Sequence, residues 1–487
     1  MRFVTSRTPL GNEPLDAVVI PAVAGSGIPA AVSDILGPLA NQLAGFLERL
    51  DLQEPGEGLW LTVAEHPPLL AVCVGPGGEG GASREALRAA TMQAATLARG
   101  QRIAVLLSLA RPSDPETDAL VAESWLLGAY RFAQGDTPNE IVLWGADPAS
   151  VAQGAIVGEC TNATRDLVNT PPADLTPLAF AEHSAALGAQ YGFRVELLEG
   201  ARLREGRFAG LVAVGAGSSN PPVLVQIERG DRELPHLALV GKGITFDAGG
   251  LSLKTTTGML TMKADMSGAA NVLSAVVAAE RLGLPTHIRA YLACAENMPS
   301  GTALRIGDVI GHRNGLTTEV VDTDCEGRLV LSDVLALATE DNPTHLIDMA
   351  TISSSTGLGP DMWAGLGTDR ELVRQLIAAG DAAGEPGWEL PLWSPYASRL
   401  RSEVADLRNS DPTVTSPFGA VLAAEYLRRF VGATPWAHID LGLTVMRTDE
   451  ADGWRKGANG NGTRTLISYL VDSSSEDGGL AVQEIRR

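Results

Sequence analysis

Cysteine is scarce in this chain of 487 residues, which has four cysteines and no C-x-x-C pair. Their wide spacing argues against a disulfide framework and against a zinc ribbon, because both need cysteines at short, regular intervals. We therefore predict free thiols at Cys73, Cys160, Cys294 and Cys325.

Long apolar runs are also missing. No segment approaches the roughly eighteen consecutive apolar residues that indicate a membrane-spanning helix. The first residues, M-R-F-V-T-S-R-T-P-L, lack the apolar core of a secretory signal peptide. These absences predict a cytoplasmic protein that has no membrane partner.

Positive charge is in short supply, with 37 Lys and Arg against 58 Asp and Glu and a formal net charge of −21. A chain this acidic, without a basic tail, is poorly suited to binding the phosphate backbone of nucleic acids. Nucleic-acid binding therefore stays only as a secondary alternative, which a gel shift at moderate salt would test.

Length and periodicity indicate the fold class. A chain of 487 residues with 45% hydrophobic residues is typical of a globular protein with two or more domains. Helical and strand-like patterns alternate, which predicts an α/β protein whose two domains each hold a mostly parallel or mixed sheet flanked by helices. We place an N-terminal α/β domain at 1–150, a helical connector at 151–170 and a larger C-terminal domain at 171–487. Apolar runs at 210–214 and 223–227 predict paired strands in the larger domain.

Charged side chains are instead concentrated in three short stretches, at 241–254, 262–265 and 322–329. Together the stretches hold five carboxylates, four basic side chains and no histidine. They read G-K-G-I-T-F-D-A-G-G-L-S-L-K, M-K-A-D and D-T-D-C-E-G-R-L, and the first and third follow apolar or β-branched runs. Ligands of open α/β sheets bind outside the carboxyl ends of strands, which is where we expect these loops.

Each charged residue taken alone has an ordinary explanation. An aspartate after a strand is most often a helix cap or turn residue, and Lys254 or Arg328 alone would be a solvated surface charge. Several acids and bases in glycine-rich turns are costly to place together unless a bound cation offsets their repulsion. Asp324 and Glu326, two apart at an expected strand end, can face one point because side chains alternate along a strand. The number of carboxylates favours two metal ions about 3.5–4 Å apart over a single ion.

These motifs resemble those of the leucyl aminopeptidase (cytosol aminopeptidase) family. Further similar stretches are D-L-V-N-T-P-P at 166–172, E-N-M-P-S-G-T-A-L-R at 296–305, L-P-L-W at 390–393 and T-P-W-A-H-I-D at 434–440. The resemblance implies a metal-dependent aminopeptidase that removes N-terminal residues from peptides with a water activated by two divalent ions, Mn or Zn. It also implies a homohexamer whose active sites face an interior cavity.

The resemblance implies roles for single residues as well. Asp247 and Glu326 would bridge the two ions. Lys254 would polarise the scissile carbonyl, and Arg328 would hold a bicarbonate that acts as general base. The implied metal ligands are Lys242, Asp247, Asp265, Asp324 and Glu326, and the implied substrate pocket includes Met262, Thr351 and Ser354.

Three departures from the family pattern lie at the expected site, and the added charge of Asp322 could tighten metal binding or shift the pKa of the water. Asp322 stands where the family usually has Asn, and Cys325 stands in place of Ala; we expect Cys325 to be a small packed side chain rather than a ligand. Residues 351–355 read T-I-S-S-S where the family usually reads T-L-T-G-A. The serines Ser353, Ser354 and Ser355 predict a shift from leucine toward smaller or more polar first residues.

Two alternatives remain open, one for the reaction at the metal site and one for the position of His438. A dinuclear carboxylate site could also hydrolyse phosphoesters. Against this, G-K-G lacks the full phosphate-binding loop G-x-x-x-x-G-K-[ST], and a single arginine offers few contacts to a phosphate group. His438 could approach the metal site, but we expect a core histidine at this position.

Overall fold

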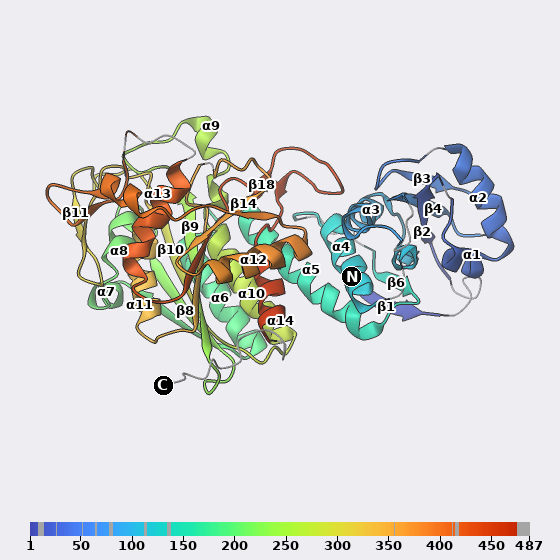
Figure 1. Ribbon diagram of the computed structural model, residues 1–487, viewed down its shortest axis with the longest axis horizontal. Helices are drawn as coiled ribbons and strands as arrows, with labels where there is room; N and C mark the ends of the chain where they lie inside the picture. The colour runs from blue at the N-terminus through green and yellow to red at the C-terminus, as the bar shows by residue number, and fades with distance from the viewer. Residues whose placement is uncertain are drawn as a thin grey trace. The chain divides into compact units, whose positions relative to one another are not determined.

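The computed structural model describes residues 1–7, 14–25, 27–50, 52–63, 66–76, 81–111, 114–133, 138–354, 356–411, 413 and 418–474. The chain divides into two compact units: Met1–Asn162 with Arg447–Gly457, and Ala163–Met446 with Ala458–Arg487. Both are α/β structures, which confirms the expected fold class (Figure 1). The division falls within helix α5 (Pro148–Asn169). The domain limits placed at 150 and 170 stay a prediction.

The first unit is built on a six-stranded sheet in which only the edge strand β3 runs antiparallel to its neighbour. Residues alternate between its two faces, as strand geometry requires. Ala17 and Val19 pack with α3 and α4, whereas Val18 and Ile20 pack with α1 and α2. In sheet order the strands are β1 (Arg2–Ser6), β6 (Glu140–Trp144), β5 (Arg102–Val105), β2 (Ala17–Ala24), β4 (Leu69–Pro76) and β3 (Gly58–Leu61).

The helices of the first unit have identifiable start signals. Ser83 caps α3 by accepting from Ala86 N–H, and Asp114 caps α4 by accepting from Thr117 N–H, with Pro115 at the first helical position. The helices are α1 (Ala30–Leu36), α2 (Pro38–Leu50), α3 (Arg84–Leu97), the 3₁₀ turn η2 (Leu107–Ala110) and α4 (Pro115–Ala129).

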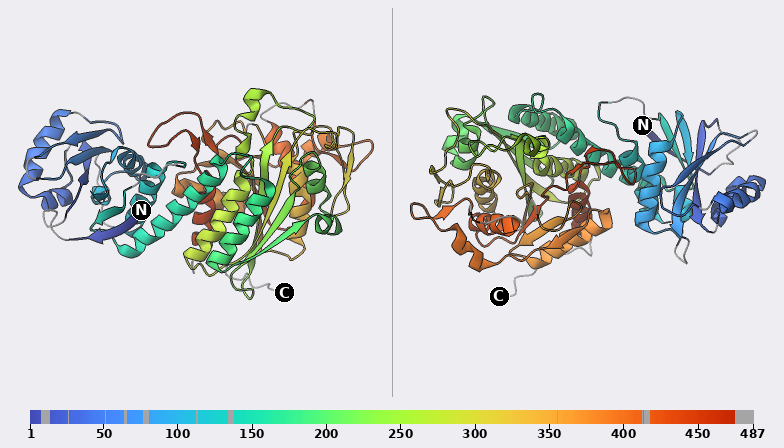
Figure 2. Two further views of the ribbon diagram at one scale, coloured as in Figure 1. Left: turned by 180° about the vertical axis from the view of Figure 1, so that it is seen from behind. Right: turned by 90° about the horizontal axis from the view of Figure 1, so that it is seen from above.

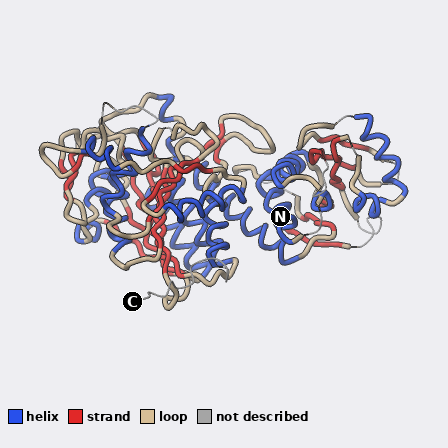
Figure 3. The backbone as a smooth tube through the Cα atoms, viewed as in Figure 1, coloured by secondary structure: helices blue, strands red, loops and turns tan. Residues whose placement is uncertain are grey.

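The second unit is built on an eight-stranded mixed sheet, which Figure 3 shows as a continuous layer of strands between helices. Its central strands β10, β9, β13 and β17 are parallel, so their carboxyl ends meet at one edge. In sheet order the strands are β15 (Gly387–Glu389), β14 (Trp363–Gly367), β17 (Trp436–Asp440), β13 (His345–Ala350), β9 (His236–Asp247), β10 (His287–Asn297), β8 (Val223–Arg229) and β7 (Arg194–Glu199).

Helices cover both faces of this sheet (Figures 1 and 2). Ala238 and Val240 of β9 face the core that includes α8, α11 and α13, whereas Gly241 faces α10, where an added Cβ would lie 2.5 Å from Ala269 Cα. The helices are α6 (Pro177–Tyr191), α7 (Ala201–Glu205), α8 (Ala209–Gly215), α9 (Thr256–Met259), η3 (Met262–Ala264), α10 (Ser267–Arg281), α11 (Gly327–Thr339), α12 (Arg370–Ala383), η4 (Ser394–Leu400), α13 (Phe418–Leu427), η5 (Arg428–Phe430) and α14 (Thr463–Ser474).

Two further small sheets are present among the described residues. Strands β11 (Val309–Gly311), β12 (Thr317–Glu319) and β16 (Leu407–Arg408) form one, and β18 (Met446–Arg447) pairs with β19 (Gly457–Ala458). The strand expected at 210–214 is wrong, because these residues form α8. Gly210 packs so closely on α11 that an added Cβ would lie 2.1 Å from Leu329 O, so tertiary packing decides the conformation of this short apolar run.

The structure also bears on the cysteines and on membrane-spanning helices. Cys73, Cys294 and Cys325 carry free thiols in the described part of the chain, as the sequence predicts. A search of the described helices finds none with the length and apolar character that crossing a membrane requires.

Candidate metal centre

Asp247 ends β9 and begins the glycine turn that shapes the site. The turn uses Gly249 and Gly250, with φ of 88° and 64°, a region that glycine adopts without a steric penalty. Gly249 N–H donates to Asp247 Oδ1 at 2.8 Å. A Cβ on Gly249 would lie 2.9 Å from Asp324 Oδ1, so the glycine makes room for the second acidic loop.

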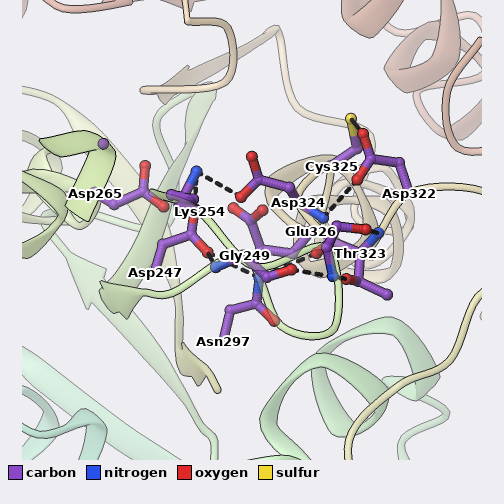
Figure 4. A network of polar contacts seen from close by, with 12 residues as sticks. Asp247, Gly249, Lys254, Asp265, Asn297, Asp322, Thr323, Asp324, Cys325 and Glu326 are labelled. Atoms are coloured by element: carbon purple, nitrogen blue, oxygen red, sulfur yellow. Dashed lines mark hydrogen bonds and ion pairs between the residues drawn. The ribbon is translucent and has the colours of Figure 1, made fainter. Parts of the chain in front are cut away.

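Asn297, at the end of β10, ties three parts of the site together. Its Nδ2 donates to Asp247 Oδ1 at 2.8 Å and to Thr323 O at 3.0 Å. Thr323 Oγ1 in turn donates to Gly249 O at 2.7 Å. Figure 4 shows this network joining the glycine turn to the loop that carries Asp324. The orientation of Asp247 is therefore fixed by neighbouring strands and not by its own turn alone.

Asp265 follows η3 and is held against the end of β13. Thr351 Oγ1 donates to Asp265 Oδ1 at 2.7 Å, and Lys242 Nζ donates to the same oxygen at 2.8 Å. Lys242 also donates to Thr351 O at 2.9 Å. Thr351 thus holds an acidic side chain as well as lining the predicted substrate pocket.

Asp324 and Glu326 are not on an extended strand end, so that part of the sequence reasoning is wrong. The preceding strand, β12, belongs to the small three-stranded sheet, Asp324 lies in a turn, and Glu326 has helical φ and ψ of −75° and −34° at the N-cap of α11. Gly327 allows close approach here, because a Cβ on it would lie 2.7 Å from Lys242 Nζ. The two acids converge through a turn into a helix.

Two lysines bridge the four acids. Lys242 Nζ lies 2.8 Å from Asp265 Oδ1 and 2.8 Å from Glu326 Oε1. Lys254 Nζ lies 2.8 Å from Asp247 Oδ2 and 2.5 Å from Asp324 Oδ1. All four acids therefore converge on a region that two side chains can span (Figure 4).

Three of these carboxylates meet the geometric requirement for a shared cation. One oxygen each from Asp247, Asp265 and Glu326 lies within 4.8 Å of the others, and all three residues are buried. Asp265 Oδ2 and Glu326 Oε2 are buried without a hydrogen-bond partner among the described residues. Buried, unpaired carboxylate oxygens are costly, and hard divalent cations prefer oxygen ligands, so this donor set fits a divalent metal.

The pKa values of three of the acids and of both lysines are shifted because these groups are buried close together. Burial raises the pKa of Asp265 and Glu326, and neighbouring carboxylates raise both further against the opposing effect of Lys242. Burial and the charge of Asp247 raise the pKa of Asp324 to about 7, despite Lys254. Burial lowers the pKa of both lysines, but the surrounding acids outweigh it and hold each pKa above its usual value.

All the site residues named from the sequence line one cavity of about 270 Å³. Its lining also includes Asp322, Cys325 and Ser353, and, from segments farther along the chain, Ser410, Asp411, Leu422 and Leu443. Ser355 lies outside the described residues. The ten predicted side chains that line the cavity are Lys242, Asp247, Lys254, Met262, Asp265, Asp324, Glu326, Arg328, Thr351 and Ser354.

Arg328 is the second residue of α11 and is 4% exposed. Its Nη1 donates to Asn409 O at 2.6 Å, whereas its buried Nε has no hydrogen-bond partner in the part of the chain that the structure describes. Asn409 is fully buried, and its side chain accepts from Val321 N–H at 2.9 Å and donates to Asp322 O at 2.6 Å. Asn409 thus positions both the acidic loop and Arg328, a role that sequence analysis missed.

His438 is a core histidine, as expected. It is fully buried in β17, and its Nδ1 lies 2.6 Å from Asp348 Oδ1, while Asp348 Oδ2 accepts from Trp436 Nε1 at 2.6 Å. Burial lowers the pKa of His438, but Asp348 outweighs this and raises it above the usual value. The cavity lining contains no histidine among the described residues.

Comparisons with known proteins bear on this geometry. The sequence profile of the cytosol aminopeptidase family, catalytic domain, matches residues 162–467. A probable cytosol aminopeptidase from Roseiflexus castenholzii is 40% identical over 410 residues, covering 80% of this chain and 83% of that protein. One from Streptomyces coelicolor is 37% identical over 495 residues, covering 93% and 95%.

Solved structures agree over nearly the whole chain. The bottromycin maturation enzyme BotP in complex with Mn is 36% identical, with a TM-score of 0.84 and coverage of 95% of this chain and 100% of that one. The cytosol aminopeptidase from Coxiella burnetii is 28% identical, with a TM-score of 0.83 and coverage of 97% and 99%. These likenesses do not favour the phosphoesterase alternative. The chain belongs to the cytosol aminopeptidase family and is a metal-dependent aminopeptidase, a hydrolase of peptides.

Proposed function

We propose that the aminopeptidase reaction takes place in the cavity at the carboxyl ends of β9, β10 and β13, with two divalent ions held by five side chains. The observation that carries this is the buried carboxylate group of Asp247, Asp265 and Glu326, two of whose oxygens have no protein partner. Manganese is the favoured metal because BotP, similar over its full length, is described in complex with Mn. The proposed ligands are the carboxylates of Asp247, Asp265, Asp324 and Glu326 and the amine of Lys242. The amine can bind a metal only in its deprotonated form, which nearby dications favour over the ammonium.

The ions would supply Lewis acidity, lowering the pKa of a water nucleophile and polarising the scissile carbonyl. Among the chain's own groups, Lys254 is the proposed oxyanion donor. It lines the cavity, and the acids around it hold its pKa above the usual value. A fixed ammonium stabilises negative charge that develops on the carbonyl oxygen.

Arg328 is the proposed holder of a bicarbonate or similar small base. Its guanidinium lines the cavity, is fixed by Asn409 O and keeps a buried Nε with no partner. A guanidinium binds a planar oxyanion through two parallel hydrogen bonds. The bound anion would accept the proton that the nucleophile loses.

The substrate's first side chain is proposed to lie against Met262, Thr351 and Ser354. These three line the cavity beside Asp265, and the exposed Ser354 makes the rim polar. The likeness to cytosol aminopeptidases further supports a cytoplasmic homohexamer, which analytical ultracentrifugation would test. A hexamer with enclosed active sites would restrict substrates to short or unfolded peptides.

The decisive experiment compares leucyl-p-nitroanilide with its N-acetyl derivative after reloading the protein with Mn, Zn, Co or Mg. A free amine must be neutral to donate its lone pair, and its ordinary pKa is about 7.7–8.0, so the rate should rise from neutral to mildly alkaline pH. Acetylation removes the donor, so the acetylated compound should be almost inert. Comparable rates on the two compounds would contradict the proposal, even if both rates depended on metal.

A further inference from the structure

The cavity has two chemically different walls. On one side, Thr351 contacts Asp265, and the cavity lining also includes the uncharged side chains of Met262 and Ser354. On the other side, Asp322 and Cys325 flank Asp324. Figure 4 shows Asp265 and Asp322 at opposite sides of the cluster, with the remaining acids between them.

A bound peptide must extend across this cluster. Its scissile carbonyl has to reach Lys254, whose Nζ contacts Asp324 of the second wall and also Asp247, an oxygen of which lies within 4.8 Å of an Asp265 oxygen on the first wall. If the first side chain lies on the Asp265 wall, as in the proposed function, the residue after the scissile bond extends toward Asp322. The two walls therefore contact different residues of the substrate.

Asp322 carries a charge that no cation balances at ion-pair distance among the described residues. Its Oδ1 accepts from Asp324 N–H at 2.9 Å, and its Oδ2 lies 3.6 Å from Cys325 Sγ. A carboxylate can accept about four hydrogen bonds, so these two contacts leave acceptor capacity on a partly buried side chain that lines the cavity.

The neighbouring acid on this wall is already neutralised. Asp411 Oδ2 lies 3.3 Å from Arg399 Nη1 and 3.5 Å from Arg408 Nη2. Asp324 is paired with Lys254 at 2.5 Å. Asp322 is thus the acid of this wall with negative charge to offer a ligand.

We infer that Asp322 is a specificity-determining residue that favours peptides with a basic side chain at the second position. The inference rests on the proposed function. It concerns the second residue of the substrate, which follows the scissile bond, and not the first residue, which the enzyme removes. A lysine or arginine there would place its cation near Asp322 and use the free acceptor sites, whereas a glutamate would meet like charge. The uncharged wall at Met262 and Ser354 gives the first residue no corresponding preference for positive charge.

The test uses leucyl dipeptide amides whose second residue is Lys, Gln or Glu, so that no terminal carboxylate interferes. The unaltered, metal-loaded enzyme should rank them Lys, Gln, Glu by kcat/KM, with most of the spread in KM. Asp322→Asn keeps an oxygen to accept Asp324 N–H and should shrink the Lys-to-Glu ratio at least about fivefold, as expected for removing one nearby charge. Glu371→Gln is the control, because it removes an exposed carboxylate of α12 that does not line the cavity.

A second variant keeps the test independent of any folding defect in Asp322→Asn. Ser410→Lys adds a cation to the same wall with Asp322 in place, and it should also shrink the Lys-to-Glu ratio. A ratio that neither variant changes would overturn the inference. The inference would also be overturned if the variants changed the relative kcat/KM of the p-nitroanilides of Lys, Gln and Glu and left the dipeptide ratio unchanged. These substrates vary the first residue, so Asp322 would then face the first residue. Normal turnover of leucyl-p-nitroanilide in either case would leave the proposed function standing; no turnover in any form of the protein would overturn both.

Discussion

The two units of this chain share an α/β layout but use buried carboxylates differently. In the first unit, Asp118 is 5% exposed, and its Oδ2 accepts Asp147 N–H at 2.8 Å, so it fixes a loop. In the second unit, Asp265 and Glu326 are as deeply buried, yet each keeps an oxygen without a partner and faces other acids. A buried carboxylate that caps a backbone N–H is structural, whereas buried carboxylates that converge call for a cation. The fold alone would not distinguish the units; the site does.

Removing a converging carboxylate should have the largest effect. We expect Glu326→Ala to lose bound metal and to lower kcat/KM on leucyl-p-nitroanilide by at least about 10³-fold, since the remaining ligands cannot offset two dications. The matched change in the first unit, Asp118→Asn, should leave metal content and turnover unchanged. Elemental analysis that finds two full equivalents of metal in Glu326→Ala would refute its role as a bridging ligand.

Removing the side chain of Lys254 should lower turnover without lowering the metal content. Lys254→Ala should lower kcat by about 10²–10³-fold, the usual loss for one oxyanion donor, with little change in metal content. Lys456→Ala is the control, because Lys456 is exposed and belongs to the first unit. A near-normal kcat for Lys254→Ala, measured together with its metal content, would leave this residue without a catalytic role.

A third kind of buried carboxylate, Asp348, sharpens the comparison through stability. It pairs with His438, and loss of one partner of a buried pair costs about 3–5 kcal/mol of unfolding free energy, with Asn retaining part of that through its hydrogen bonds. Because the folded pKa of His438 is raised, the stabilisation is complete below the unfolded pKa of about 6.5 and is lost as pH rises through the higher folded value. Asp348→Asn should therefore destabilise the protein more at pH 6 than at pH 9 in urea unfolding. Equal losses at both pH values would show that the pair is not ionised.

Much of the site could be predicted because its residues lie in long, local motifs. Asp247 with the following glycines, and Glu326 with Gly327, are neighbours in the sequence, so their chemistry is visible before folding. The strand expected before the first charged loop is present as β9. All ten predicted side chains line one cavity.

The rest depends on contacts between distant segments. Asn297 and Asn409 hold the acidic loop through hydrogen bonds across 26 and 88 residues of chain, and neither bond has a local signal. The same holds for α8, whose apolar run has no periodicity that separates a strand from a helix. The turn at Asp324 was mistaken for a strand end because the β-branched run before it forms only a three-residue strand in a separate sheet.

The smallest expected effect concerns the rim of the uncharged wall. Ser353 Oγ donates to Asp440 Oδ2 at 2.6 Å, so it is tied to the end of β17, whereas Ser354 is exposed at the cavity. Ser354→Gly should therefore move the first-residue preference toward leucine, while Ser353→Gly mainly loosens the loop. A pocket difference of this size is worth about 1–3 kcal/mol, so the ratio of leucyl to alanyl p-nitroanilide turnover should change by a graded factor, with little change in metal content. The same ratio before and after Ser354→Gly would show that this rim does not select the first residue, and selection would then rest on the other proposed pocket residues, Met262 and Thr351.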